Sequence, residues 1–120
     1  MLTIGNVVMG VDDFPRGVAF WTQALGYVPR DGVVDDDRWV VLVPAGGRPG
    51  PHLALERSET PTQERPRVHL DLYTVDQKGE IERLIGLGAS EVDWDLYPED
   101  ADFVVLADPE GSRFCVVDRS

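Results

Sequence analysis

The sequence lacks the cysteines that a disulfide framework or a thiolate-rich zinc site requires. Of its 120 residues only Cys115 is a cysteine, so no disulfide can form within the chain and a site with several thiolates is excluded. A chain without disulfides suits a reducing interior. We therefore expect a cytoplasmic protein.

Long apolar runs and an excess of positive charge are also missing. The longest apolar stretch, residues 39–43, is far too short to cross a bilayer, and no basic residue precedes Arg16. Eleven basic residues stand against 22 acidic ones, for a net charge of −11. This is the wrong sign for an affinity that depends on neutralising phosphates, so we expect neither nucleic acid nor membrane as a partner.

The apolar content is sufficient for one hydrophobic core. Hydrophobic residues make up 42% of the chain and include three tryptophans, and a chain of this length buries roughly two thirds of its unfolded surface. Residues 1–120 are therefore predicted to form a single domain.

The two halves of the sequence are similar to each other. Four short motifs recur at offsets of 62 to 64 residues. The matched pairs are Val11-Asp12 with Val75-Asp76, Leu25-Gly26 with Leu87-Gly88, Trp39–Leu42 with Phe103–Leu106, and Glu56-Arg57 with Asp118-Arg119. A repeat of this length, present twice, predicts two similar modules, about 1–60 and 61–120.

Each module has the pattern of a strand, a helix and three further strands. Apolar alternation and turn residues predict strands at 3–11, 27–28, 39–43, 52–56, 68–75, 91–94, 103–107 and 113–117. Helices of about 11 residues are capped by Asp13 and Asp76, and end near Gly26 and Gly88. Their predicted apolar faces comprise Val18, Trp21 and Leu25, and Ile81, Leu84 and Ile85. The fold class is α+β: two tandem βαβββ modules forming a mixed, mostly antiparallel concave sheet with helices on the outer face. The linker 58–66 is expected to carry no chemistry.

Three motifs resemble the glyoxalase and bleomycin-resistance group of the vicinal oxygen chelate superfamily. These are Phe20-Trp21 before Leu25-Gly26, then His69-Leu70-Asp71-Leu72, and finally Asp108-Pro109-Glu110-Gly111 leading to Phe114-Cys115-Val116-Val117. The resemblance covers the whole chain and points to a glyoxalase-like domain protein. It implies a homodimer that takes a small-molecule ligand.

Metal-dependent members of that superfamily hold a divalent ion with side chains at four positions. The resemblance places Asn6, Leu53, His69 and Cys115 there. An amide, a leucine, one imidazole and one thiol make a poor ligand set for Mg²⁺, Mn²⁺, Fe²⁺ or Ni²⁺. We therefore expect no metal and no other cofactor.

His69, Asp71 and Tyr73 alternate with Leu70 and Leu72, so the polar side chains share one face of a strand. This face is expected to line a hollow, where a hydrogen-bonded His69–Asp71 pair would orient or deprotonate a ligand and makes these two residues the candidate catalytic groups. The alternative is that both side chains satisfy backbone groups in a sheet interior or at a dimer seam.

Aromatic side chains are the other candidates for ligand binding, because pockets for flat organic molecules are commonly built from rings. The candidate ligand-binding residues are Trp39, His69, Asp71, Tyr73, Trp94, Tyr97, Phe103 and Cys115. Trp21 is instead expected in the core. Cys115 is more typical of a small apolar wall residue than of a nucleophile.

Three functions remain open from the sequence. The first is a metal-free module that binds or sequesters an organic ligand, cationic or aromatic, in an aromatic-lined cavity. The second is an enzyme of lyase, isomerase or dioxygenase type, using either a divalent metal or His69/Asp71 acid–base chemistry. The third is a dimerisation or regulatory domain without a ligand.

Overall fold

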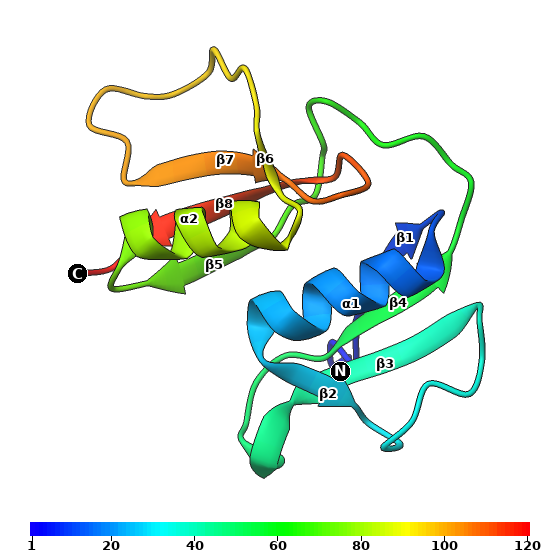
Figure 1. Ribbon diagram of the computed structural model, residues 1–120. Helices are drawn as coiled ribbons and strands as arrows, with labels where there is room; N and C mark the ends of the chain where they lie inside the picture. Colours follow the sequence, from blue (N-terminus) through cyan, green and yellow to red (C-terminus); the bar gives the residue numbers. More distant parts are fainter. The chain divides into compact units, whose positions relative to one another are not determined.

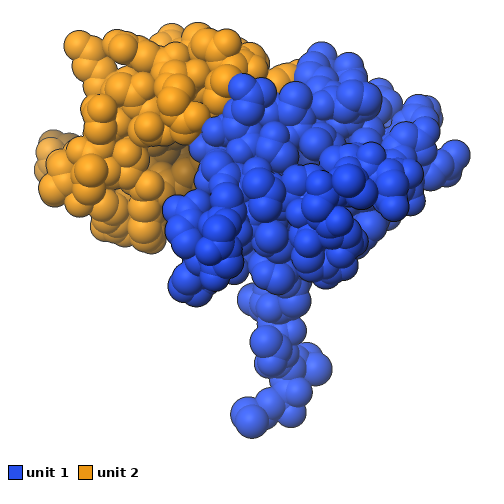
Figure 2. All heavy atoms as spheres, turned by 60° about the horizontal axis from the view of Figure 1, so that its bottom comes forward, with its two compact units in different colours: residues 1–61 blue, residues 62–120 orange.

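The strands and helices group into two compact units, Met1–Pro61 and Thr62–Ser120, which the computed structural model describes over residues 1–120 (Figure 2). Each unit contains one helix and four strands in the order strand, helix, strand, strand, strand (Figure 1). The predicted α+β fold of two tandem βαβββ modules is confirmed.

Unit 1 contains a four-stranded sheet with the order β1-β4-β3-β2. Its elements are β1 (Val7–Val11), α1 (Phe14–Leu25), β2 (Tyr27–Pro29), β3 (Trp39–Pro44), the short 3-10 helix η1 (Ala45–Gly47) and β4 (Leu53–Arg57). The β1–β4 pair is parallel and the other two pairs are antiparallel. The sheet is thus mixed and mostly antiparallel.

Unit 2 repeats this topology with the strand order β5-β8-β7-β6. Its elements are β5 (Asp71–Thr74), α2 (Gln77–Leu87), β6 (Ser90–Glu91), β7 (Phe103–Ala107) and β8 (Arg113–Asp118). Again only the first pair, β5–β8, is parallel. The parallel crossover through a helix in each unit is what a βαβββ module requires.

The helices begin and end where the sequence predicts. The carboxylate of Asp13 accepts a hydrogen bond from the Arg16 backbone N–H at 3.2 Å, and Asp76 accepts one from Gly79 at 3.1 Å. Each satisfies a backbone donor that has no partner within its helix. Gly26 ends α1 with φ 66°, the left-handed conformation that favours glycine. Neither helix is long and apolar enough to cross a membrane.

Helix α1 buries a face somewhat different from the predicted one. Phe14, Gly17, Phe20 and Trp21 are buried, whereas the predicted Val18 and Leu25 are only half-buried. Gly17 explains the rotation, because a Cβ atom there would lie 2.9 Å from Cγ1 of Val11. The missing side chain lets the helix backbone come close to the end of β1. The prediction that Trp21 belongs to the core is confirmed by its exposure of 0%.

In α2 only Leu84 of the predicted apolar face is buried. Ile81 is half-buried and Ile85 is 39% exposed. The helix is anchored by Gln77, whose side-chain amide donates to the carbonyl of Val116 on β8 at 3.0 Å.

Three strands are shorter than predicted. β1 starts at Val7 instead of residue 3, because its partner β4 starts only at Leu53, two residues after the Pro-Gly-Pro turn. β5 covers residues 71–74 of the predicted 68–75. β6 stops at Glu91, and the next available donor, the N–H of Val105, bonds to the Tyr97 hydroxyl at 2.8 Å. A side chain thus replaces the backbone partner, and residues 92–102 are released from the sheet.

Candidate functional site

The register of unit 2 sets two rows of side chains on one face of its sheet. Asp71 pairs with Cys115, which pairs with Val105, and one step along the sheet Tyr73 pairs with Val117, which pairs with Phe103. Because side chains alternate along a strand, these rows point to the same side. The buried cluster of Val105, Cys115 and Val117 forms the centre of this face.

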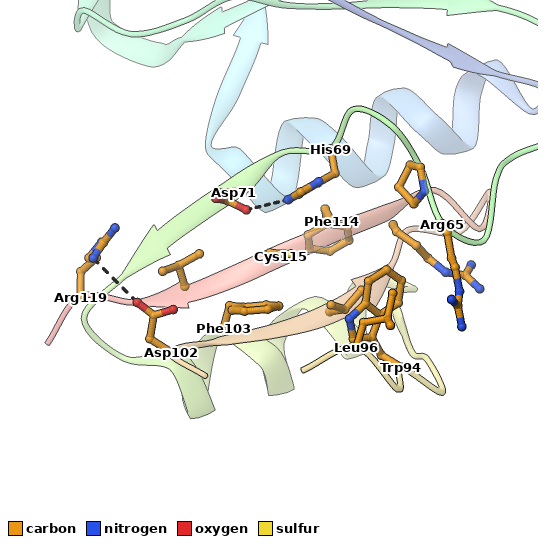
Figure 3. A pocket seen from close by; sticks show the side chains of 14 residues that line it. Arg65, His69, Asp71, Trp94, Leu96, Asp102, Phe103, Phe114, Cys115 and Arg119 are labelled. Atoms are coloured by element: carbon orange, nitrogen blue, oxygen red, sulfur yellow. Dashed lines mark hydrogen bonds and ion pairs between the residues drawn. The ribbon is translucent and has the colours of Figure 1, made fainter. Parts of the chain in front are cut away.

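A pocket of about 410 Å³ opens over this face, entirely within unit 2 (Figure 3). Its lining combines apolar floor residues with charged side chains at the rim. The lining residues are Arg65, Pro66, His69, Asp71, Trp94, Leu96, Asp102, Phe103, Val105, Arg113, Phe114, Cys115, Val117 and Arg119. Such a concave, largely apolar site with a few polar groups is typical of small-molecule binding.

Three polar side chains meet in one wall of the pocket. Nε2 of His69 lies 3.1 Å from Oδ1 of Asp71, which is the hydrogen-bonded pair predicted from the strand alternation. Cys115 lies opposite Asp71 on β8, and the imidazole nitrogen, carboxylate oxygen and thiol sulfur are all within 4.8 Å of one another. His69 and Asp71 are half-exposed, with side-chain exposures of 44% and 51%, so both can reach a bound molecule.

The environment of Cys115 keeps its thiol protonated. Burial, which is the largest cause, together with the negative charge of Asp71 and a hydrogen bond to its carboxylate, raises the pKa of Cys115 to about 11. The reactive form of cysteine is the thiolate. Cys115 therefore acts as a pocket wall and a hydrogen-bond donor at neutral pH, and not as a nucleophile.

Replacing Asp71 with asparagine should make Cys115 more reactive. The substitution removes the charge that opposes ionisation, so the pKa of the thiol falls, although burial still holds it above its ordinary value. We expect the rate of alkylation by iodoacetamide at pH 9 to increase several-fold, roughly as the thiolate fraction does. Mass spectrometry measures this directly, because the chain has a single cysteine.

The matched control for this prediction is Asp102→Asn. Asp102 also lines the pocket but lies in the ion pair with Arg119 and does not contribute to the pKa of Cys115. Equal acceleration in both variants would contradict the assignment to Asp71.

In the unmodified chain the alkylation rate should keep rising up to about pH 11. The free energy of unfolding should fall over the same range, because the unfolded thiol ionises at a lower pH than the folded one.

The donor atoms in this wall do not suit Mg²⁺ or Mn²⁺. Mg²⁺ and Mn²⁺ need several oxygen ligands, whereas the wall offers one nitrogen, one oxygen and one thiol sulfur. The thiol must lose its proton to bind a metal, and its raised pKa opposes that loss. Leu53, at another of the four family positions, has no donor atom and is buried.

The apolar part of the pocket comes from Trp94 and Phe103, which pack against the cluster of Val105, Cys115 and Val117. Trp94 lies in the segment that leaves the sheet after β6. Tyr97, from the same segment, packs its ring against Phe103 with centroids 5.3 Å apart. The hydrogen bond from Val105 to the Tyr97 hydroxyl thus holds this segment against the sheet edge.

Five of the eight predicted ligand-binding residues line this pocket, and three do not. His69, Asp71, Trp94, Phe103 and Cys115 belong to the first group. Trp39 lies on β3 in unit 1 and is 40% exposed. Tyr73 is 65% exposed, with the guanidinium of Arg119 4.4 Å from its ring centroid, and Tyr97 supports the pocket from behind Phe103.

Sequence reasoning missed the arginines. Arg65 and Pro66 lie in the linker that was expected to carry no chemistry, and both line the pocket. Arg113 could have been found, because it alternates with Cys115 and Val117 on the predicted last strand. Arg119 follows β8 and reaches the pocket from its far end (Figure 3).

Comparisons with known proteins point to one group. A family model described as glyoxalase-like domain matches residues 6–117. No curated protein sequence matches the chain.

Several solved structures have a similar fold at low sequence identity. A glyoxalase/bleomycin resistance protein/dioxygenase family enzyme from Burkholderia phytofirmans has a TM-score of 0.74 at 15% identity, with 98% of each chain covered. The fosfomycin resistance protein FosX from Listeria monocytogenes has a TM-score of 0.75 at 14% identity, covering 100% of this chain and 93% of its own. A gene product from Arabidopsis thaliana has a TM-score of 0.75 at 17% identity, covering 98% of this chain and 100% of its own. Identities this low establish the fold alone.

Proposed function

The chain belongs to the glyoxalase-like domain family of the vicinal oxygen chelate group, and we propose that it binds a small organic molecule with a flat apolar part, without a metal. The fold of this group serves several chemistries, so the proposal is argued from the pocket of this chain. The family resemblance inferred from the sequence motifs is confirmed by the match over residues 6–117. The fold is shared with enzymes and with resistance proteins, so the ligand has to be argued from the site.

One observation carries the proposal. The pocket of about 410 Å³ has an apolar floor, an aromatic wall of Trp94 and Phe103, and a polar wall of His69, Asp71 and Cys115. A planar ring can lie between this wall and the floor, where it replaces water against apolar surface. The His69–Asp71 pair then supplies a directed polar contact to a substituent of the ring.

The proposal predicts saturable binding that changes the fluorescence of Trp94. The protein would be titrated in EDTA with a panel of bicyclic aromatic compounds, and tryptophan emission recorded. We expect quenching in the unmodified protein and its loss in Trp94→Phe, because Trp21 is fully buried in unit 1 and Trp39 does not line the pocket. Phe103→Ala should weaken binding about 10-fold or more, since it removes most of one aromatic wall.

Trp39→Phe is the matched control, because it removes a tryptophan of unit 1 and should leave the titration unchanged. Quenching that survives in Trp94→Phe would contradict the proposed site. A requirement for added Mn²⁺ or Ni²⁺ would contradict the metal-free proposal.

A second candidate function rests on the His69–Asp71 hydrogen bond at the pocket wall. An imidazole held by a carboxylate is a competent general base, so the pair could remove a proton from a bound substrate. The same titration separates the two functions. A compound recovered with unchanged mass supports sequestration, whereas a product whose formation is lost in His69→Gln supports an enzyme.

The homodimer expected from the resemblance stays a prediction. Each sheet ends in a first strand, β1 or β5, that is hydrogen-bonded to a neighbour of its own sheet on one side only. Edges of this kind are usually covered in native proteins, and a second copy of the chain would be one way to cover them.

A further inference from the structure

Arg113 differs from every other basic residue in the chain. Of the eleven lysines and arginines, ten are exposed and Arg113 alone is half-buried. It is the first residue of β8 and lines the pocket, two positions before Cys115 on the same strand. A guanidinium cannot lose its charge in a protein, so this position carries a permanent, partly desolvated cation.

No carboxylate of the protein neutralises this cation. The other two arginines of the pocket have acidic partners: Arg65 lies 2.7 Å from Asp95 and Arg119 lies 3.9 Å from Asp102. Arg113 makes no ion pair, and its one side-chain hydrogen bond runs from Nη1 to the carbonyl of Gly111 at 2.7 Å. Its Nε is buried and has no acceptor within hydrogen-bond distance.

Leaving a partly buried charge without a counter-charge is unfavourable, because the cost of removing it from water is not offset. It is also unusual in this chain, where acidic residues outnumber basic ones by 22 to 11. In the pocket lining, by contrast, basic residues outnumber acidic ones, with three arginines against two aspartates. Both aspartates are already engaged, Asp71 by His69 and Asp102 by Arg119. The charge of the pocket therefore favours an anion, in contrast to the charge of the whole chain, which suggested a cationic guest.

We infer that the pocket of unit 2 takes an aromatic carboxylate, whose carboxylate is bound by Arg113 and whose ring lies against Trp94 and Phe103. The planar guanidinium fork matches a planar carboxylate and can offer two parallel N–H donors. Only Nη1 of the terminal guanidinium nitrogens is bonded within the protein, to the carbonyl of Gly111, which leaves the other N–H donors of these two nitrogens for the carboxylate. Figure 3 shows Arg65 at the same end of the pocket as Trp94, and Arg119 with Asp102 at the opposite end. Arg65 thus adds a second, more exposed cation beside the ring. This inference rests on the proposed binding function and specifies its ligand class.

The test uses three probes with one ring system and different charge. 2-Naphthoate, 2-naphthylmethanol and 2-naphthylmethylamine would be titrated at pH 7.5 in EDTA, with the change in Trp94 emission as the signal. We expect 2-naphthoate to bind at least about 10-fold more tightly than the alcohol, and the amine to bind weakest. In Arg113→Met, which keeps an unbranched apolar stem but removes the guanidinium, the affinity for 2-naphthoate should fall about 10-fold or more. The affinity for the alcohol should stay within about 2-fold, since the aromatic wall is intact.

Arg83→Met is the matched control, because Arg83 lies on α2, outside the pocket, in an ion pair with Glu80. It changes the net charge equally and should leave 2-naphthoate binding unchanged. Arg113→Lys keeps the charge without the fork and should give an intermediate affinity, and it replaces Arg113→Met if that variant fails to fold. Equal affinity of the three probes, or tightest binding of the amine, would overturn the inference while leaving the proposed function standing. Failure of all three probes to bind would overturn both.

Discussion

Substituting Trp21 with alanine should lower the free energy of unfolding by about 3–5 kcal/mol, the usual cost of removing a large aromatic side chain from a core. Trp21 is fully buried, and its ring meets Phe20 edge to face with centroids 5.0 Å apart. It lies on the face of α1 that Gly17 brings close to β1. The chain around it cannot collapse into the space, because the helix backbone is already in van der Waals contact with Val11.

Urea unfolding followed by circular dichroism measures this loss. Trp39→Ala is the matched control: it removes the same side chain from a position that is 40% exposed, so its cost should be well below that of Trp21→Ala. Similar losses in the two variants would show that Trp21 does not anchor the core.

Since residues 1–120 are predicted to form a single domain, Trp94 fluorescence in unit 2 should follow the same transition. Two separate transitions would contradict the single-domain prediction.

The second large effect is expected at Asp108, in the turn that joins β7 to β8. Asp108 is 3% exposed, and its Oδ1 accepts hydrogen bonds from the backbone N–H groups of Glu110 and Ser112, both at 2.9 Å. Asp108→Ala leaves these two donors without their acceptor, and should cost about 2–4 kcal/mol. Asp108→Asn retains an oxygen at the same place and should cost much less.

Comparison of these two variants by thermal unfolding separates the hydrogen bonds from the charge. If the alanine and asparagine variants are equally destabilised, the charge is what matters and our explanation of the turn is wrong. The turn also sets the start of β8, where Arg113 pairs with Ala107. Asp108→Ala should therefore weaken binding of 2-naphthoate more than binding of the neutral alcohol, even under conditions where it remains folded.

Local chemistry made much of the fold predictable. Asp13 and Asp76 cap their helices because the carboxylate of an aspartate just before a helix can accept a hydrogen bond from the N–H three residues later, whatever the helix packs against. β7 matches its predicted range because the apolar run from Phe103 to Ala107 is bounded by turn residues. The His69–Asp71 pair was predictable because side chains two residues apart on an extended chain point the same way.

The predictions failed where a distant residue decides the outcome. The length of β6 depends on Tyr97, because its hydroxyl accepts the hydrogen bond from the backbone N–H of Val105 that would otherwise go to a longer β6. The buried face of α1 depends on the contact between Gly17 and Val11, and this contact cannot be predicted from the spacing of apolar residues along the helix. The linker looked chemically inert because nothing local shows that Arg65 and Pro66 border a pocket.

The sequence by itself determined the duplicated βαβββ architecture, the helix caps, the family and one polar pair, all of which depend on residues close together in the chain or on a repeated pattern. Only the tertiary structure decided which side chains share the pocket and what charge it presents. The sheet buries Cys115, and strand pairing places Asp71 against it from 44 positions earlier; burial first, and then the carboxylate, raise the pKa of the thiol. The same sheet leaves Arg113 half-buried without a carboxylate. The charge of a pocket is a property of the few groups that line it in space, and here three arginines and two aspartates line it, whereas acidic residues predominate in the whole sequence.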